Sequence, residues 1–391
     1  MVVGLILEAN PYHNGHKYLV NQAKLKFPDS PIIAITSTSF TMRGEISLLD
    51  KFQKTKILLN EGIDLVFELP ISFTLQSADY FAYNTVYTLY KAGVTDIIIG
   101  CEEDDENNLK KYHQITTSNE FKTKFKENLH LKTSYKSTFE KTLQDLGFDD
   151  KIIELFNSPN MTLALSYYKV ILDNNLQINL HLIKRTTDYY QKNETHQKTA
   201  SASYIRELYQ NGQVFCQYLP YDPQFIDLTA FESNIMKIIN FQILSKETEK
   251  TDENLNGNTE GILNFILQNG KFDGSFKDLM NSLKNKRYSF SRIRRVLLSY
   301  LLNISSTYNM NENYLRLLGL SSLGSTYLST LPKKTKQLIF SNPNELKRFD
   351  GSNIQTIFAY EISSTKLFGL LTNNNNLYLK EYQLPIKKEG I

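Results

Sequence analysis

The first hundred residues alternate between short apolar runs and longer segments with helical spacing. The apolar runs are Val2–Leu7, Ile32–Ile35, Leu65–Phe67 and Ile97–Ile99, and the helical segments between them are Tyr18–Lys26, Asp50–Leu59 and Ala78–Lys91. Strands separated by helices in this way build βαβ units, whose strands run parallel and are covered by helices. The alternation therefore predicts an α/β chain with a Rossmann-like parallel sheet.

The strand pattern stops after the fourth run and then resumes. The acidic cluster Glu102–Glu106 leads into a Lys-rich, helix-compatible stretch, residues 110–141, in which eight lysines face three acids. Such a stretch is either a solvated helix face or a surface for a phosphate backbone. The apolar run Ile178–Ile183 and the helical segment Ser203–Tyr209 then indicate that the sheet continues.

Past about residue 215 the helical pattern dominates. Helical spacing covers Leu228–Ser245, Ile262–Leu267, Phe276–Leu283, Ser291–Leu302 and Glu312–Leu318, and the polar segment Lys246–Glu260 has the composition of a loop. Near the end, Leu367–Leu371 and Leu377–Leu379 flank the turn-rich tetrad Asn373–Asn376, which predicts a hairpin. We therefore expect a first domain at 1–215, with a helical insertion at about 102–150, and a mainly helical second domain at 216–391.

The composition excludes several classes of protein. Of the 391 residues 41% are apolar, yet no apolar run approaches the roughly 18–20 residues that a membrane span needs. Two cysteines are too few for a disulfide framework, and the first residues lack the basic start and cleavage site of a secretory signal. We expect a cytoplasmic protein. The net charge of +3 indicates no particular partner.

The strongest local signal is the segment Asn10–His16, between the first predicted strand and the first predicted helix. Ligands of parallel sheets bind at this edge, and the amide groups of a helix N-terminus favour phosphate. His13 and His16 lie on one face of a helix start, and Gly15 allows a ligand to approach the backbone closely. Both imidazoles could donate hydrogen bonds to a phosphate and stabilise the charge that develops when an α-phosphorus is attacked.

Two histidines are also suited to a metal. Zinc could be ligated by His13 and His16, with Glu8 as a third ligand, although no further His or Cys lies nearby in the sequence. The 24 tyrosines could likewise stack on bases, but packing is the commoner use of tyrosine.

The segment Glu8–His16 resembles the opening motif of the bacterial tRNA(Met) cytidine acetate ligases, which belong to the nucleotidylyltransferase superfamily with a His-x-Gly-His motif. Further blocks follow in the family order over most of the chain. They are Phe40-x-x-Arg43-Gly44-Glu45 with Asp50-Lys51, Asp64–Pro70, Gln76–Ala78, Gly100–Glu102, Ser158–Asn160, Lys184-Arg185, Ser201–Arg206, Arg287-Tyr288, Ser291–Arg295 and Leu317–Gly319. Several blocks in order are far more specific than any one of them alone.

The resemblance implies an ATP-dependent ligase. Such an enzyme uses ATP with Mg²⁺ to activate acetate as acetyl-adenylate, and then acetylates the wobble cytidine of elongator tRNA(Met). His13 and His16 would be catalytic, and no residue is assigned to a metal; Mg²⁺ could be held by protein carboxylates or mainly by ATP. The residues that the resemblance assigns to ATP are Leu7, Glu8, Ala9, Asn10, Pro11, Tyr12, His13, Asn14, Gly15, His16, Gly100, Asn160, Arg185, Ser201, Ser203 and Arg206.

Two of these assignments have a simpler alternative. Ser201 could be only a helix N-cap, and Arg206 only a solvated helix charge.

A basic cluster in the second domain carries the expected RNA contacts. Six cations occur there without an acid among them and with Tyr288 and Phe290 interleaved: Lys284, Lys286, Arg287, Arg292, Arg294 and Arg295. The cluster is either a solvated face or, beside a nucleotide-activating domain, a binding site for the tRNA backbone.

Two other functions remain open from the sequence. The chain could be a nucleotidylyltransferase that adenylylates a small phosphorylated cofactor precursor, for which the basic cluster would be superfluous. It could also be a non-catalytic RNA-binding relative that keeps the nucleotide fold.

Overall fold

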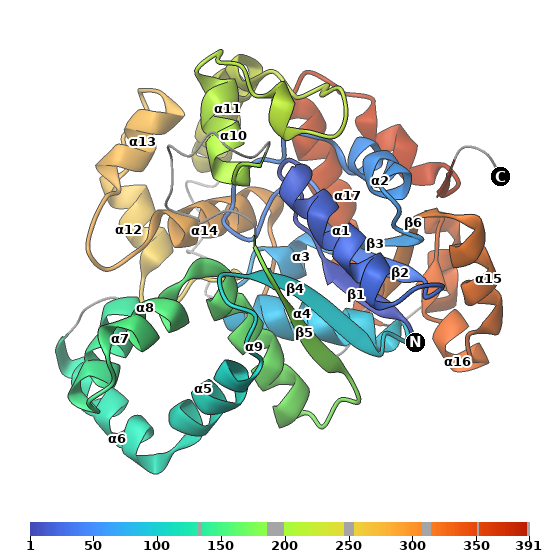
Figure 1. The fold of residues 1–391 in the computed structure, drawn as a ribbon. Coiled ribbons are helices and arrows are strands. Elements are labelled where there is room, and N and C mark those ends of the chain that lie inside the picture. Colours follow the sequence, from blue (N-terminus) through green and yellow to red (C-terminus); the bar gives the residue numbers. More distant parts are fainter. Residues whose placement is uncertain (132–134, 186–198, 246–253, 307–313, 350–351, 389–391) are drawn as a thin grey trace.

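The computed structural model describes residues 1–131, 135–185, 199–245, 254–306, 314–349 and 352–388. Its centre is a sheet with the strand order β5-β4-β1-β2-β3-β6-β7, in which β8 lies beside β6 (Figure 1). The strands are β1 Val3–Ile6, β2 Ile32–Ser37, β3 Leu65–Leu69, β4 Asp96–Cys101, β5 Asn179–Lys184, β6 Leu315–Leu320, β7 Ile339–Phe340 and β8 Ile386–Lys387.

The five strands β1 to β5 are mutually parallel, which confirms the α/β prediction. Helices connect them as right-handed βαβ units require. These helices are α1 Asn14–Lys26, α2 Lys51–Asn60, α3 Ile71–Thr74 and α4 Ala78–Lys91. The carboxyl ends of β1 and β4 meet at one edge of the sheet, where the loop after β1 enters α1. This edge carries the candidate site.

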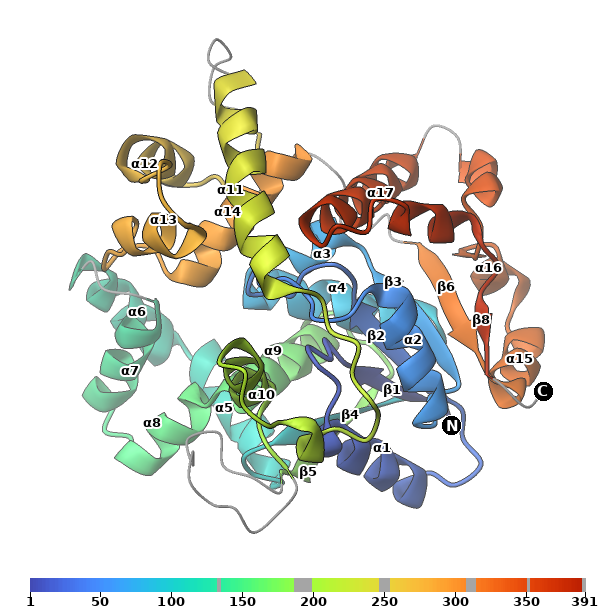
Figure 2. The same cartoon turned by 90° about the horizontal axis from the view of Figure 1, so that it is seen from above.

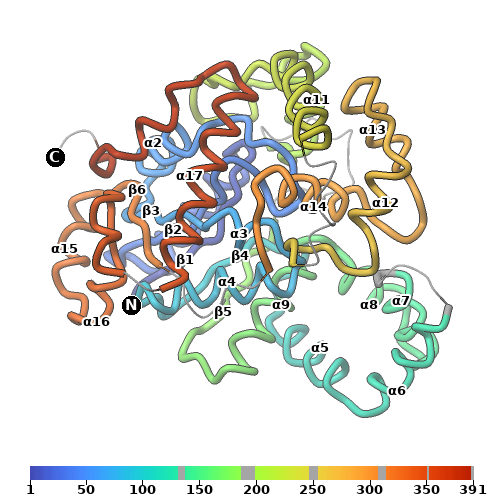
Figure 3. Tube along the Cα trace, turned by 180° about the vertical axis from the view of Figure 1, so that it is seen from behind, coloured from blue at the N-terminus to red at the C-terminus, as the bar shows by residue number. Residues whose placement is uncertain are grey.

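The predicted interruption of the sheet is a helical lobe. It consists of α5 Asn107–Thr117, α6 Asn119–Asn128, the short helix η1 Leu129–Leu131, α7 Tyr135–Asp145 and α8 Asp150–Asn157. Figures 1 and 3 both show α5 to α8 together beyond the β5 edge of the sheet. The long helix α9, Pro159–Asp173, packs on α4 and brings the chain back to β5.

The helices predicted between residues 200 and 302 are present. They are α10 Ala202–Gln210, the short helix η2 Cys216–Tyr218, α11 Leu228–Ser245, α12 Ile262–Asn269, α13 Phe276–Ser282 and α14 Phe290–Leu302. Part of the predicted loop Lys246–Glu260 lies outside the described residues, since these resume at residue 254. The division of the chain at residue 215 stays a prediction.

One predicted helix is wrong. Leu315–Leu320 forms β6, which pairs antiparallel with β3, whereas the segment Glu312–Leu318 was expected to be helical. Five of its six residues are buried, because β6 is covered on both faces. A short apolar run of this kind has no periodicity that separates a buried strand from a buried helix. The first two residues of the predicted helix, 312 and 313, lie outside the described residues.

The predicted terminal hairpin is also wrong. Leu367–Leu371 is the last part of α17, Asn353–Leu371, and Leu377–Leu379 belongs to the short helix η4, Leu377–Tyr382. Asn373 ends the long helix in a left-handed conformation (φ 56°), and the Asn374 amide donates to the Gly369 carbonyl at 2.8 Å. Asparagine tolerates this conformation at a helix end as well as in a hairpin turn, so the Asn-rich tetrad fits both structures.

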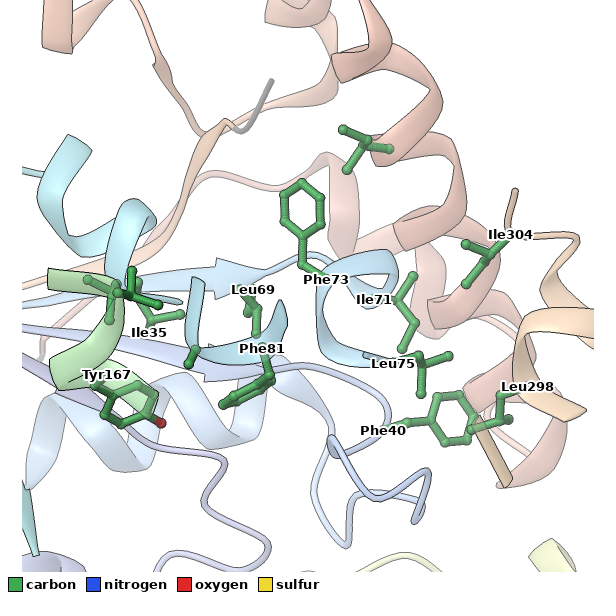
Figure 4. Packing of buried hydrophobic residues seen from close by; sticks show 14 of the residues in the cluster. Ile35, Phe40, Leu69, Ile71, Phe73, Leu75, Phe81, Tyr167, Leu298 and Ile304 are labelled. Atoms are coloured by element: carbon green, nitrogen blue, oxygen red, sulfur yellow. The ribbon is translucent and has the colours of Figure 1, made fainter. Parts of the chain in front are cut away.

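The remaining elements bring the C-terminal part of the chain back to the sheet. They are α15 Ser322–Thr330, α16 Lys333–Lys336 and the short helix η3 Pro343–Phe349, which lie with α17 around β6 to β8 (Figure 2). The apolar core is continuous from the sheet into this part. Figure 4 shows Ile35 and Leu69 of the sheet in the same cluster as Phe40 and, beyond it, Leu298 of α14. Within the described residues, no helix combines the length and apolarity that a bilayer crossing needs.

A buried ionic cluster also joins the C-terminal part to the sheet. Lys51 Nζ lies 3.0 Å from a carboxylate oxygen of Glu68, 3.0 Å from one of Glu361 and 2.7 Å from one of Glu381. Arg316 pairs with both Glu68 and Glu381. Burial alone would lower the pKa of Lys51, but the three carboxylates together raise it. Burial and the neighbouring carboxylates of Glu68 and Glu381 raise the pKa of Glu361 to about 7, against the opposite effect of Lys51.

Candidate active site

The loop between β1 and α1 is held in place mainly by the side chain of Asn10. Its amide nitrogen donates to the Ile46 carbonyl at 3.0 Å, and its amide oxygen accepts from the Leu48 backbone at 2.8 Å. Ala9 has a left-handed backbone (φ 47°), and the Asn10–Pro11 peptide is cis. Asn10 therefore ties the loop to the segment that follows β2, so that the loop enters α1 in one defined path.

His13 and His16 form a reciprocal cap at the start of α1. His13 is the N-cap residue, and its Nδ1 accepts the Gly15 backbone N–H at 3.0 Å. The His13 backbone N–H in turn donates to Nδ1 of His16 at 3.2 Å. The two ring centroids are 3.9 Å apart, and Tyr12 also stacks on His16, with the ring centroids 5.4 Å apart.

These contacts fix the protonation of both rings. Burial lowers the pKa of His13 well below its usual range and lowers the pKa of His16 to about 3, and nearby cations such as Arg185 act in the same direction. Both imidazoles are therefore neutral near pH 7. A neutral ring whose Nδ1 accepts a hydrogen bond carries its proton on Nε2. Each histidine can thus offer one Nε2–H donor to a ligand at the helix start.

A cleft that is partly open to solvent lies in front of the histidines. It brings together seven of the residues assigned to ATP from the sequence: Leu7, His13, Gly15, His16, Gly100, Asn160 and Arg185. Apolar side chains cover its walls, among them Leu19, Leu163 and Ile183. The mixture of apolar walls with a few converging polar groups is typical of a site for a small molecule.

Gly100 and Arg185 form one side of this cleft. A Cβ on Gly100 would meet Arg185 Cγ at 3.6 Å and Leu19 Cδ1 at 3.8 Å, which are ordinary contacts, so the position is not required by packing alone. The Arg185 backbone N–H donates to the Cys101 carbonyl at 2.9 Å and anchors the residue at the end of β5. Its charge lowers the pKa of both histidines, which places a cation near them.

Asn160 is positioned by Glu102, a residue that the sequence analysis named in an acidic cluster and in a family block but did not assign to the site. One Glu102 oxygen accepts from the Asn160 side-chain amide at 2.8 Å, and the other accepts from the Met161 backbone at 3.0 Å. Glu102 follows β4 directly and so reaches the N-terminus of α9, where a carboxylate is stabilised by the free amides. The signal available in the sequence for the role of Glu102 was the position of an acidic residue directly after the carboxyl end of a predicted strand.

Lys54 is a second residue that sequence reasoning missed. It is fully buried in α2 and donates to the Glu8 carbonyl at 2.9 Å and to the Ser37 carbonyl at 2.8 Å. It thereby joins the chain after β1 to the end of β2. Burial lowers its pKa to about 8, and it lies close enough to lower the pKa of His16. A lysine on a helix normally indicates a solvated face, so this burial could not be predicted from the residue pattern.

The other residues assigned to the opening motif support the cleft from behind. Glu8, Ala9, Asn10, Pro11, Tyr12 and Asn14 are not among the residues that line it. The Glu8 carboxylate accepts the Met42 backbone N–H at 2.6 Å, and burial raises the pKa of Glu8. Asn14 donates to the Gln217 carbonyl at 3.0 Å, and Tyr221 donates to the Tyr12 carbonyl at 3.1 Å.

Ser201, Ser203 and Arg206 lie at or near the start of α10 outside the lining of the cleft, and Arg206 reaches the histidine loop. Ser201 is the N-cap of α10, since its Oγ accepts the Tyr204 backbone N–H at 3.2 Å. Arg206 is not the solvated helix charge that the simpler alternative proposed. One of its NH groups donates to the Asn10 carbonyl at 2.7 Å, and the other pairs with Glu45 at 2.8 Å.

The six cations of the basic cluster do not share one environment. Lys284, Lys286 and Arg287 are exposed. Arg292 pairs with Glu260 at 3.1 Å and lies over the ring of Tyr288. Arg294 and Arg295 instead face the loop after β2, where Arg294 pairs with Glu45 at 3.3 Å and Arg295 donates to the Met42 carbonyl at 3.3 Å. Burial lowers the pKa of Arg295 to about 10.

The zinc alternative finds no support in this geometry. The Nδ1 atoms of both histidines already accept backbone hydrogen bonds, and the Glu8 carboxylate accepts from Met42. Within the part of the chain that the structure describes, no group of three or more His, Cys, Asp and Glu side chains could hold a metal ion.

Comparison with known proteins places this arrangement in a family. A family model described as HIGH Nucleotidyl Transferase matches residues 1–383. A tRNA(Met) cytidine acetate ligase of Thermosipho africanus is 32% identical over 359 residues, which cover 88% of this chain and 85% of that protein. A ligase of the same name from Fusobacterium nucleatum is 31% identical over 402 residues, which cover 96% and 97% of the two chains.

Solved structures show the same fold. Thermotoga maritima TmcAL bound with alpha-thio ATP matches 99% of both chains with a TM-score of 0.80 and 24% identity, and the apo form gives 0.84. The family model matches nearly the whole chain, and relatives above 30% identity cover most of it. The chain therefore belongs to the HIGH nucleotidyl transferase family and, within it, to the tRNA(Met) cytidine acetate ligases.

Proposed function

We propose that this protein uses ATP to activate acetate as acetyl-adenylate and transfers the acetyl group to the wobble cytidine of elongator tRNA(Met). The observation that carries the proposal is the convergence of two neutral histidines, Gly100, Asn160 and Arg185 on one cleft at the carboxyl edge of the parallel sheet. The names of the relatives supply the reaction, and the cleft supplies groups suited to its first step.

In that first step a carboxylate oxygen of acetate attacks the α-phosphorus of ATP. The bond between the α-phosphorus and the bridging oxygen breaks, and pyrophosphate leaves with the electron pair. The Nε2–H groups of His13 and His16 would donate to the phosphate oxygens on which charge develops. Because neutral imidazoles donate hydrogen bonds without adding charge, the cations Arg185 and Lys54 supply the positive potential around them.

The adenosine would lie against Gly100, between the apolar side chains of Leu19 and Leu163. Because Gly100 carries no side chain, a flat base can lie closer to its backbone than it could at any larger residue. Asn160, held by Glu102, can offer its side-chain oxygen to the nucleotide, since its amide nitrogen is already bonded. Mg²⁺ would enter with the triphosphate, whose oxygens are ligands that this ion prefers.

In the second step the exocyclic amine of cytidine attacks the acetyl carbonyl carbon. The acyl–phosphate bond breaks, AMP leaves, and the amine loses a proton. We propose that residues 1–215 perform the activation and that residues 216–391 hold the tRNA, with the exposed Lys284, Lys286 and Arg287 on its phosphates. The tRNA substrate places the enzyme in the cytoplasm.

Exchange of labelled pyrophosphate into ATP tests the proposal without tRNA. Exchange should require acetate and fall by about two orders of magnitude or more in His16→Ala. Exchange that needs a phosphorylated cofactor precursor instead of acetate would support the small-molecule alternative. A protein that binds tRNA but shows no exchange with either compound would support the non-catalytic alternative.

A further inference from the structure

The loop after β2 lies between the histidine loop and α14. Residues Phe40 and Ile46 close this loop, which we call the 40–46 loop, through an antiparallel bridge. Gly44 has a left-handed backbone (φ 68°), and a Cβ there would lie 2.6 Å from the Cβ of Arg294. The backbone of the loop therefore touches α14 directly, and Phe40 and Leu298 belong to one apolar cluster beneath it (Figure 4).

Two polar connections cross the 40–46 loop from α14 to the chain after β1. In the first, Arg294 pairs with one oxygen of Glu45 at 3.3 Å, while Arg206 pairs with the other at 2.8 Å. Arg206 then donates to the Asn10 carbonyl at 2.7 Å. Glu45 thus links an arginine of α14 to the backbone three residues before His13.

The second connection passes through Met42. Its carbonyl accepts from Arg295 at 3.3 Å, and its N–H donates to the Glu8 carboxylate at 2.6 Å. Both connections end on the segment that presents the two histidines. The groups are only partly exposed, with 27% of the Arg294 and Glu45 side chains and 21% of the Arg206 side chain accessible, so solvent weakens these pairs less than it weakens surface pairs.

We propose that Glu45 and Arg294 are positioning residues for the activation of acetate, before any tRNA binds. By holding Glu45, Arg294 keeps Arg206 against the Asn10 carbonyl and so fixes the path of the loop that aims His13 and His16 at the phosphates. This inference rests on the proposed function. It separates Arg294 from the exposed cations of the basic cluster, because a residue that only contacts tRNA has no effect on a reaction without tRNA.

The test is acetate-dependent ATP–pyrophosphate exchange in the absence of tRNA. Glu45→Gln and Arg294→Met should each lower kcat/KM for ATP about tenfold. The double variant should lose no more of its kcat/KM than the more strongly affected single variant, because both changes break one connection. Arg294→Lys, which keeps the charge, should recover part of the loss. Arg348→Met removes a surface arginine paired with Glu345 and serves as the matched control, with unchanged exchange.

A role in folding alone would give a different pattern. It would lower the thermal midpoint and the active fraction but leave kcat/KM for ATP, counted per folded molecule, unchanged, and that result would overturn the inference. Full exchange by Arg294→Met together with weaker tRNA binding would also overturn it. If Arg294→Met does not fold, Glu45→Gln and Arg294→Lys decide by the same kcat/KM per folded molecule.

Failure of the proposed function has a distinct outcome. If the wild-type protein shows no acetate-dependent exchange, the acetate assignment fails. The inference is then decided by the affinity of the same variants for ATP in equilibrium binding, where an affinity equal to that of the wild type would overturn it.

Discussion

His13 and His16 cap the same helix start, and each accepts a backbone N–H on Nδ1, so both present Nε2 as a donor. The arrangement uses histidine as a neutral hydrogen-bond donor and not as an acid. Burial is the main cause, since it lowers the pKa of both rings.

The histidine pair should therefore stay neutral on mild acidification. In the free protein, nuclear magnetic resonance of labelled imidazoles should show no protonation of His16 between pH 8 and 5, because its pKa lies at about 3. Spectra of His13→Gln and His16→Gln assign the two signals. A ring that titrates between pH 6 and 7 with Nδ1 protonated would contradict this description of the site.

A larger residue at Gly100 should leave the fold intact but weaken the binding of ATP. The Cβ of Gly100→Ala would meet its neighbours at ordinary distances, so the thermal midpoint should be unchanged or slightly higher. The same methyl group occupies the space that we assign to adenosine, and KM for ATP should rise about tenfold or more. An unchanged KM would place the base elsewhere in the cleft.

Lys51 should be important for stability through its buried pairs. Lys51→Met leaves Arg316 alone against three carboxyl groups and should cost about 3–5 kcal/mol of unfolding free energy at pH 8. The loss should be smaller at pH 5. Lys51 lowers the pKa of Glu361 and of Glu381, so both carboxyl groups bind protons more readily in the folded variant than in the folded wild type, and lower pH favours folding of the variant more.

Denaturant unfolding at the two pH values measures this effect. Lys56→Met, on an exposed position of the same helix, is the control and should change the free energy by less than about 0.5 kcal/mol. Equal losses for Lys51→Met at pH 5 and pH 8 would mean that the carboxyl groups of the cluster do not take up protons.

The exposed cations should act on tRNA alone. Replacing Lys284, Lys286 and Arg287 by glutamine should weaken tRNA binding without changing tRNA-free exchange. The slope of the logarithm of the binding constant against the logarithm of the salt concentration should become shallower by up to about three released counterions. Lys333, Lys334 and Lys336 of α16 provide a matched triple variant with the same change in charge. Equal weakening by both variants would indicate a non-specific charge effect.

The parallel sheet and the histidine loop could be predicted from the sequence because both depend on local pattern. Apolar runs alternate with helices, and the histidines follow the first strand directly. The strand β6 and the buried Lys54 could not be predicted in this way. The burial of β6 comes from β3, some 250 residues earlier in the chain, and the partners of Lys54 are backbone carbonyls at the ends of two other strands.

The basic cluster shows the same limit at the level of the site. Its composition indicated either a solvated face or one RNA surface, and the sequence pattern does not separate its six cations. The structure turns Arg294 and Arg295 toward the 40–46 loop because α14 buries its apolar face there, while Lys284, Lys286 and Arg287 lie before the helix and stay exposed. Charge pattern alone does not contain this difference, since it depends on tertiary contacts.

Mass spectrometry of elongator tRNA(Met), incubated with the protein, ATP, Mg²⁺ and acetate, tests directly whether the protein acetylates the wobble cytidine. We expect one added acetyl group on that cytidine, which requires both ATP and acetate and is lost with His16→Ala. Unmodified tRNA after incubation with a protein that catalyses acetate-dependent exchange, or acetylation at another nucleotide, would contradict it.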